Sequence, residues 1–232
     1  MRFGNSNLQL PPLTKINKIF VISIVSVFLL HSIIKVSTGA YISQYLSLSG
    51  GLFFSGHLYQ ILVYPVMATG LFEVIFDCLI LWFIGSELEL LWGEKRYLRY
   101  IFISSIFGGA LFLGISSVLG FWSFLSGPGG VCYALLLAYA ILFPDRTLIL
   151  YLFPIKAKWF CLILVAILLY QGVFTPGSAG AWGHLCTMSA GFGYLLFLTR
   201  KSLKLPKFKT RKKNKPGLRI VKDDDDGPKY WH

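Results

Sequence analysis

Long apolar runs separated by short polar segments are the main pattern along this chain of 232 residues. A transmembrane helix needs roughly 20 mostly apolar residues to cross a hydrocarbon core of about 30 Å. Six windows approach this length, and no segment between them has the pattern of a soluble domain: 17–37, 69–88, 98–119, 129–143, 158–174 and 181–199. The pattern therefore predicts an all-α membrane protein, a bundle of six transmembrane helices within residues 15–200.

Composition agrees with a polytopic membrane protein. Hydrophobic residues make up 55% of the chain and charged residues 14%, whereas a soluble domain usually has about a quarter of its residues charged. The abundance of Leu, Ile, Val and Phe excludes disorder, and four cysteines are too few for a disulfide-stapled secreted module. An ordinary water-soluble enzyme is excluded.

Basic residues, which give a net charge of +12, gather on one side of the predicted bundle. With the N-terminus inside, the inner connections and the C-terminal tail hold most Lys and Arg residues, and the outer connections hold only Lys35. The positive-inside rule then places both termini in the cytoplasm. We expect a multi-pass integral membrane protein of the cell (inner) membrane. The first window has a basic start like that of a signal peptide, but we interpret it as a retained helix because it is too long.

The predicted organisation has three parts: a cytoplasmic segment at 1–14, the membrane domain at 15–200 and a basic tail at 201–232 that we expect to be disordered. A basic cluster beside a spanning helix is attracted to anionic lipid headgroups by about 1 kcal/mol per charge. We therefore expect the tail to contact anionic lipid. Nucleic acid is not an expected partner, because the topology already explains the charge.

The fourth window is short, about 22 Å of helix at 1.5 Å per residue, and it follows the segment Ser126-Gly127-Pro128-Gly129-Gly130, which cannot be regular helix. Irregular backbone at membrane depth is tolerated only where it is buried in protein or lines a water-filled cavity. We infer an aqueous hollow that opens outward above the fourth helix.

Three ionisable residues lie at a similar depth: Glu73, Asp77 and His184. A charge in lipid costs several kcal/mol, so we expect these side chains to face the interior or the hollow. They could hydrogen-bond neighbouring helices, form a proton or ion pathway, or bind a metal, although their spacing supports no specific metal site. We expect no metal and no cofactor. Four buried cysteines are expected to act as small hydrophobic residues: Cys78, Cys132, Cys161 and Cys186.

Three segments of the chain match motifs of one known family of membrane proteins. Residues 127–135, GPGGVCYAL, resemble the fourth-helix motif G-x-S-G with its following aromatic-Ala-Leu, and Phe143–Arg146 continues that likeness. Residues 85–93 resemble the end of the second helix with its loop, and residues 183–191 resemble the sixth-helix His segment. These segments resemble the rhomboid family, and the resemblance implies a rhomboid-like six-helix bundle with a short fourth helix and both ends inside.

Rhomboids are intramembrane serine proteases, in which a fourth-helix Ser is the nucleophile and a sixth-helix His is the base. The matching nucleophile position is Gly129, which has no side chain and cannot form an acyl-enzyme. Ser126 lies three residues earlier, too far displaced for this chemistry. The base position is retained as His184, and the supporting positions are retained as Gly127, Gly130 and Tyr133, the last of which packs against the histidine in the family.

The oxyanion-equivalent positions on the second helix are altered. The family often has a His and an Asn where this chain has Glu73 and Asp77, and an ionised carboxylate would repel a developing oxyanion. An earlier His position aligns with Ala68. A sixth-helix Gly becomes Thr187, which fills space at a close helix contact. Together these changes predict a pseudoprotease.

Three function classes follow. The leading hypothesis is a non-catalytic rhomboid-superfamily protein that binds transmembrane helices of client membrane proteins. The alternative is an active rhomboid serine endopeptidase whose sequence carries an inactivating Gly129 or uses an unusual nucleophile, so enzyme activity stays open. A third class is a transporter-like or proton-handling protein built on Glu73, Asp77 and His184.

Overall fold

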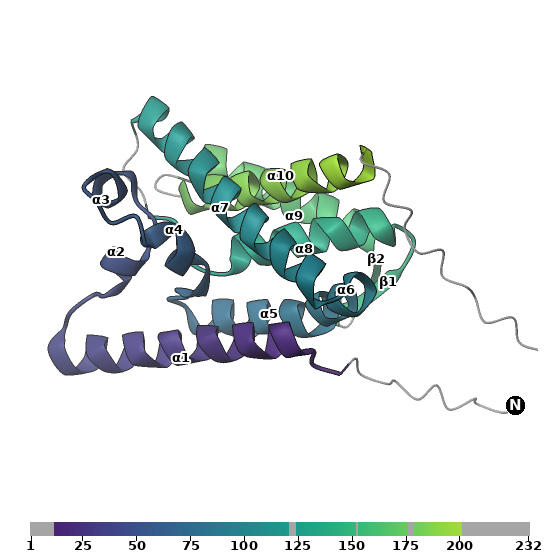
Figure 1. Cartoon of the computed structure of the whole chain (residues 1–232), viewed down its shortest axis with the longest axis horizontal. Coiled ribbons are helices and arrows are strands. Elements are labelled where there is room, and N and C mark those ends of the chain that lie inside the picture. Colours follow the sequence, from purple (N-terminus) through teal and green to yellow (C-terminus); the bar gives the residue numbers. More distant parts are fainter. Residues whose placement is uncertain (1–11, 121–123, 152, 176–178, 201–232) are drawn as a thin grey trace, which may run out of the picture.

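The structure is a computed structural model that describes residues 12–120, 124–151, 153–175 and 179–200 (Figure 1). The predicted basic tail, 201–232, and most of the predicted N-terminal segment, 1–14, lie outside the described residues.

Each of the six predicted windows is helical. The corresponding elements are α1 (Lys15–Thr38), α5 (Leu71–Ile80) with its continuations η2 (Leu81–Gly85) and α6 (Ser86–Trp92), α7 (Glu94–Leu119), α8 (Gly129–Leu142), α9 (Ala157–Phe174) and α10 (Ala179–Arg200). The connection before α5 folds into short helices that the apolar pattern did not predict: α2 (Ser43–Leu46), α3 (Gly50–Phe54), α4 (Gln60–Val63) and η1 (Tyr64–Val66).

A short antiparallel hairpin, which the apolar pattern did not predict, joins α8 to α9 in a fold that is otherwise helical over the described residues. Its strands are β1 (Thr147–Tyr151) and β2 (Phe153–Lys156), with Thr147 opposite Lys156. Where the chain enters and leaves the hairpin, Lys158 of α9 donates a hydrogen bond to the carboxylate of Asp145, which precedes β1, at 3.1 Å. The hairpin is a local connection, and the fold is otherwise helical over the described chain.

Length and apolarity support a membrane protein. Three described helices are long and apolar enough to cross a membrane: α1, α7 and α9. A fourth span is possible if two segments that meet at an angle of 91°, Gln60–Val66 and Leu71–Trp92, are taken together as one broken span. By contrast, α8 has only 14 residues, and α10 contains Gly, Ser, Thr and His residues that dilute its apolar character. The six crossings therefore stay a prediction.

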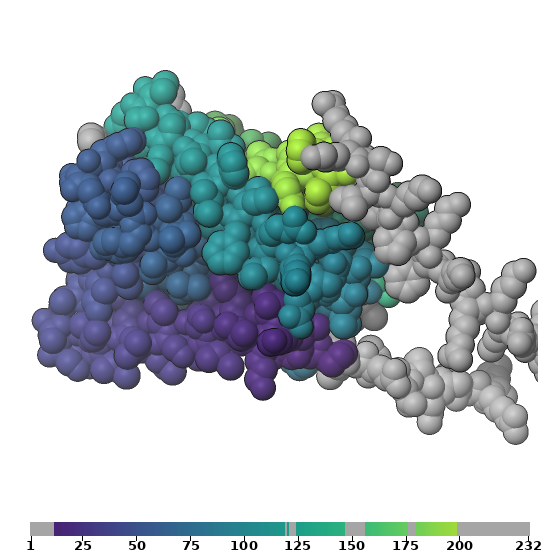
Figure 2. Space-filling model, in the orientation of Figure 1, coloured from purple at the N-terminus to yellow at the C-terminus, as the bar shows by residue number. Residues whose placement is uncertain are grey.

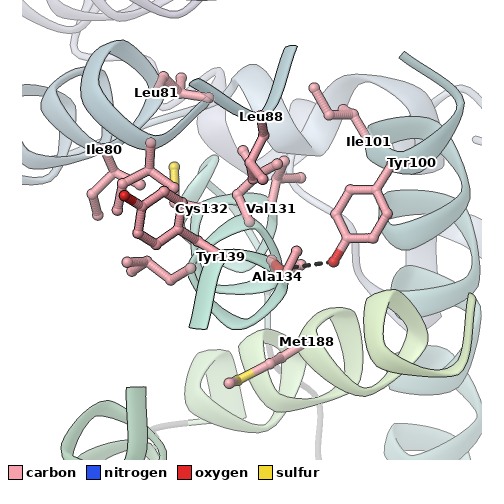
Figure 3. Packing of buried hydrophobic residues seen from close by; sticks show 14 of the residues in the cluster. Ile80, Leu81, Leu88, Tyr100, Ile101, Val131, Cys132, Ala134, Tyr139 and Met188 are labelled. Carbon is pink, nitrogen blue, oxygen red and sulfur yellow. Dashed lines mark hydrogen bonds between the residues drawn. The ribbon is translucent and has the colours of Figure 1, made fainter. Parts of the chain in front are cut away.

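The core centres on α8. Ten of its 14 residues are buried, so it is enclosed by other helices. The Tyr100 hydroxyl of α7 donates a hydrogen bond to the Ala134 carbonyl oxygen at 2.7 Å (Figure 3). Gly191 of α10 allows close approach there, because a Cβ would lie 2.6 Å from the Tyr100 hydroxyl oxygen and 3.0 Å from the Ala134 Cβ.

In contrast to the buried helix α8, the outer helices α1 and α9 expose many of their side chains. Large apolar side chains on α1 and α9 are exposed, among them Val36 at 87% and Phe174 at 69%. Figure 2 shows α1 as a continuous band along one side of the molecule. Exposed apolar helix faces are expected where lipid, rather than water, is the solvent.

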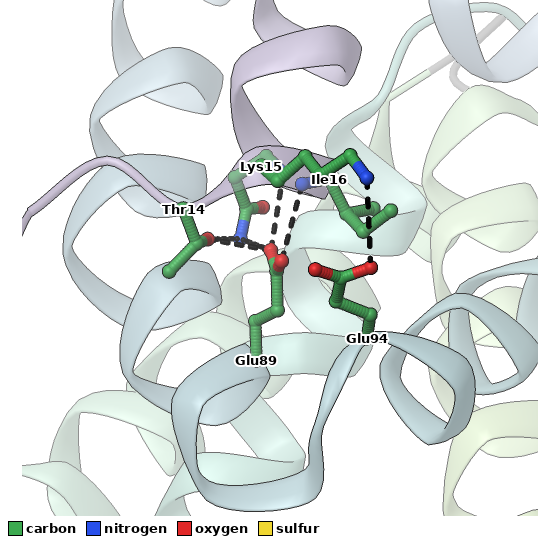
Figure 4. Close-up of polar contacts among 6 residues, drawn as sticks. Thr14, Lys15, Ile16, Glu89 and Glu94 are labelled. Atoms are coloured by element: carbon green, nitrogen blue, oxygen red, sulfur yellow. Dashed lines mark hydrogen bonds and ion pairs between the residues drawn. The ribbon is translucent and has the colours of Figure 1, made fainter.

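Glu89 of α6 fixes the start of α1 (Figure 4). Its carboxylate accepts hydrogen bonds from the backbone N–H groups of Ile16 at 3.1 Å and Asn17 at 3.2 Å. The first N–H groups of a helix have no partner within the helix, and a negative charge is favourable there. Glu89 therefore caps a helix that lies far from it in sequence.

Candidate functional site

The site lies where α8 begins. The loop before α8 is held by backbone hydrogen bonds: Leu48 and Leu125 exchange two of 2.8 Å each, and the Gly127 N–H donates to the Tyr64 carbonyl oxygen at 3.0 Å. Gly127 has a φ of +93°, a conformation that favours glycine. The irregular segment predicted from the sequence is thus fixed against the α2–η1 connection, and Gly129 starts the helix.

Gly129 of α8 faces the His184 ring of α10. A Cβ at Gly129 would lie 3.2 Å from His184 Cε1 and 3.5 Å from its Nε2. Tyr133, one turn along α8, packs edge-on against the same ring, with the ring centroids 5.4 Å apart. The two positions that the resemblance pairs, far apart in sequence, are therefore neighbours in space.

The Nδ1 atom of the His184 ring is buried and has no hydrogen-bond partner among the described residues. At the position that faces this ring, Gly129 supplies no hydroxyl.

Glu73 caps its own helix, a role that the sequence reasoning missed. Its Oε2 atom accepts hydrogen bonds from the backbone N–H groups of Thr69 at 3.3 Å and Gly70 at 3.2 Å. This is one half of a capping box, in which a Glu at the third helical position reaches back to the N-cap. Its other oxygen lies against Gly127, where a Cβ would overlap it. The signal was present in the sequence, as Gly70 followed three residues later by Glu73.

Asp77 is buried between α5 and α8, with only 6% of its surface exposed. The Cys132 thiol of α8 donates a weak hydrogen bond to the Asp77 backbone oxygen at 3.7 Å. The side-chain Oδ2 atom is buried without a partner. Both α5 residues, Glu73 and Asp77, thus lie against α8 or the loop before it. No group of three or more His, Cys, Asp and Glu side chains in the described ranges is arranged to hold a metal ion.

Thr187 fills the contact between three helices. It is fully buried, and its Oγ1 donates a hydrogen bond to the Gly183 carbonyl oxygen at 2.9 Å. A Cβ at Gly130 of α8 would lie 2.9 Å from that hydroxyl oxygen, and a Cβ at Gly108 of α7 would collide with Thr187. Gly130 is therefore required by packing against Thr187.

Comparison with known proteins agrees with this architecture. The family described as Eukaryotic integral membrane protein (DUF1751) matches residues 18–215. A similar curated protein is Rhomboid-like protein 19 of Arabidopsis thaliana, 29% identical over 150 residues, which cover 59% of this chain and 49% of the relative. The chain therefore spans about half the length of that curated relative.

Proposed function

The chain belongs to the eukaryotic integral membrane protein family DUF1751 and is rhomboid-like, and from this premise we propose that it is a non-catalytic protein that binds transmembrane helices of client membrane proteins. The proposal includes six membrane crossings, both termini in the cytoplasm of a cell and a basic tail against anionic lipid. The single observation that carries it is the glycine facing His184.

Acyl transfer by a serine protease needs a hydroxyl activated by an adjacent base. Position 129 has the right neighbour, because a Cβ there would touch the His184 ring at 3.2 Å, but Gly129 supplies no hydroxyl. The oxyanion side also argues against catalysis. The Glu73 carboxylate is committed to capping α5, and Asp77 is buried against α8. The alternative, an active serine endopeptidase, would need another hydroxyl at this ring.

A client helix would be held by packing and by interhelical hydrogen bonds, each worth about 1 kcal/mol in a membrane. Two buried atoms beside α8 have no partner in the described chain: His184 Nδ1 and Asp77 Oδ2. A bundle with a short helix and unsatisfied polar atoms favours clients whose helices carry polar residues. Leucine-only helices carry no polar group, so the proposal predicts that helices with polar residues bind more tightly than leucine-only helices.

Two single-span reporters of equal length test this, one with an all-Leu span and one with a central Asn-Gly pair. A photo-crosslinking residue at Phe124, which is 50% exposed above α8, should capture the Asn-Gly reporter and not the all-Leu one. The same residue at Val36, 87% exposed on α1, is the matched control and should capture neither selectively. Capture of neither reporter at Phe124 would contradict client binding, and equal capture of both would contradict the selectivity for polar helices.

A further inference from the structure

A lateral groove of about 430 Å³ runs between α1, the α4–η1 segment and α7, which lie next to one another in Figure 1. Its volume falls within the range of about 300–1,000 Å³ that is typical of ligand pockets. Its few polar atoms are satisfied by the protein: Ser23 Oγ donates to the Ile19 carbonyl oxygen at 2.9 Å, and Ser105 Oγ to the Tyr64 hydroxyl oxygen at 3.3 Å. The groove therefore suits an apolar occupant.

The length of the groove limits that occupant. On α7 it extends from Leu98 to Ile106, which is about 12 Å of helix at 1.5 Å per residue. This is less than half of the thickness of a hydrocarbon core of about 30 Å. A transmembrane helix about 30 Å long would contact the groove over less than half of its length. An extended acyl chain is thin enough to enter.

One end of the groove is basic. Lys95 precedes Leu98 by three residues and Arg99 precedes Phe102 by three, so both lie on the face of α7 that lines the groove. Both side chains are exposed. The Arg99 Nε–H donates to the Lys95 carbonyl oxygen at 3.3 Å, which keeps the guanidinium near the lysine.

These two cations are not neutralised by their neighbours. The nearest acidic residue along α7, Glu94, lies 4.0 Å from the Lys15 ammonium of α1. Among the described residues, no carboxylate forms an ion pair with Lys95 or Arg99. By the same spacing, Glu94 also lies at this end, four residues before Leu98, and together with Lys15, Lys95 and Arg99 it leaves a net charge of +2 there.

We propose that this groove binds an anionic phospholipid, with one acyl chain between α1 and α7 and its headgroup, which has a net negative charge, beside Lys95 and Arg99. The site is separate from the basic tail, and it does not depend on the client-binding proposal. Each cation near an anionic headgroup contributes about a fivefold gain in affinity, so the two together contribute about 30-fold.

The test uses the full-length chain in detergent micelles, with native mass spectrometry to titrate phosphatidylserine and phosphatidylcholine. The wild type should retain phosphatidylserine in preference to phosphatidylcholine. The double variant K95A/R99A should bind phosphatidylserine about 30-fold more weakly and phosphatidylcholine unchanged. The control R96A removes an equivalent charge from a different face of α7 and should change affinity less than twofold. The tail is identical in all variants, so its contribution cancels.

Filling the groove gives an independent readout. The variants Ser23→Leu and Ser23→Phe place apolar bulk where α1 lines the groove and should reduce retention of both lipids, the larger side chain more. The proposal is overturned if K95A/R99A and R96A weaken phosphatidylserine binding equally, or if the wild type retains phosphatidylcholine as tightly as phosphatidylserine. Unchanged phosphatidylserine binding in both Ser23 variants would also overturn it.

Discussion

Replacing Glu89 with Gln tests how α1 is attached to the bundle. The carboxylate is 4% exposed. Its Oε2 atom accepts hydrogen bonds from the Thr14 hydroxyl, the Asn17 backbone N–H at 3.2 Å and the Asn17 side-chain Nδ2 at 3.0 Å, and its Oε1 atom accepts from the Ile16 N–H at 3.1 Å (Figure 4). Every contact is with a donor, so the cluster requires an acceptor with two oxygens.

Glutamine keeps the shape but turns one oxygen into a donor that faces other donors. A hydrogen bond to a charged group contributes about 1.5–3 kcal/mol, and breaking a buried charged contact costs about 3–5 kcal/mol. We therefore expect Glu89→Gln to lower the free energy of unfolding by about 3 kcal/mol. For a chain of this size that corresponds to a fall in Tm of about 6–12 °C.

The assay is thermal unfolding of the full-length protein in detergent, followed by circular dichroism. The matched control is Glu94→Gln, because Glu94 pairs with Lys15 at 4.0 Å while both side chains are more than half exposed. Such surface pairs contribute about 0–1 kcal/mol, so the Tm of the control should stay within about 4 °C of the wild-type value. If Glu89→Gln unfolds no earlier than Glu94→Gln, the capping argument is refuted.

Three further variants follow from the packing and the polar contacts. Gly130→Ala should cost about 1–3 kcal/mol by overpacking against Thr187, and adding Thr187→Ala should restore much of the loss in the same unfolding assay; no restoration would refute that contact. Tyr97→Phe, which leaves the buried Asn17 Oδ1 without its donor, should cost about 1–3 kcal/mol by thermal unfolding, and an unchanged Tm would contradict this. Asp77→Asn should leave solute and proton flux in reconstituted vesicles unchanged, whereas an altered flux would favour the transporter class.

The helices could be predicted from the sequence because their apolar runs are long. The window 17–37 became Lys15–Thr38, and 158–174 became Ala157–Phe174. The helix that corresponds to the second window, 69–88, continues to Trp92 in the structure. The predicted window ends earlier because Glu87 and Glu89 interrupt the apolar pattern. In the structure these carboxylates have partners on other elements: Glu87 accepts a hydrogen bond from Tyr139, and Glu89 caps α1. Hydropathy does not register such tertiary contacts.

The proximity of two site positions could be predicted from the sequence, but the roles of the nearby carboxylates could not. The resemblance placed Gly129 opposite His184, and the structure brings the two together. The capping role of Glu73 is a local pattern that the oxyanion interpretation obscured. The anchoring of α1 by Glu89 could not be predicted, because its partners lie more than 70 residues away and no local pattern connects them. The number of membrane crossings is likewise not fixed by length and apolarity, since α8 is short and α10 is rich in small and polar residues.

The central claim is that this rhomboid-like bundle lacks a nucleophile, and labelling of the full-length protein in membranes with a serine-directed fluorophosphonate tests it most directly. An active rhomboid protease labelled in parallel provides the positive control. The account predicts no covalent adduct on the wild-type chain, because no hydroxyl projects from Gly129 toward His184. Mass-spectrometric detection of an adduct on Ser126, or on any other serine whose labelling requires His184, would contradict it.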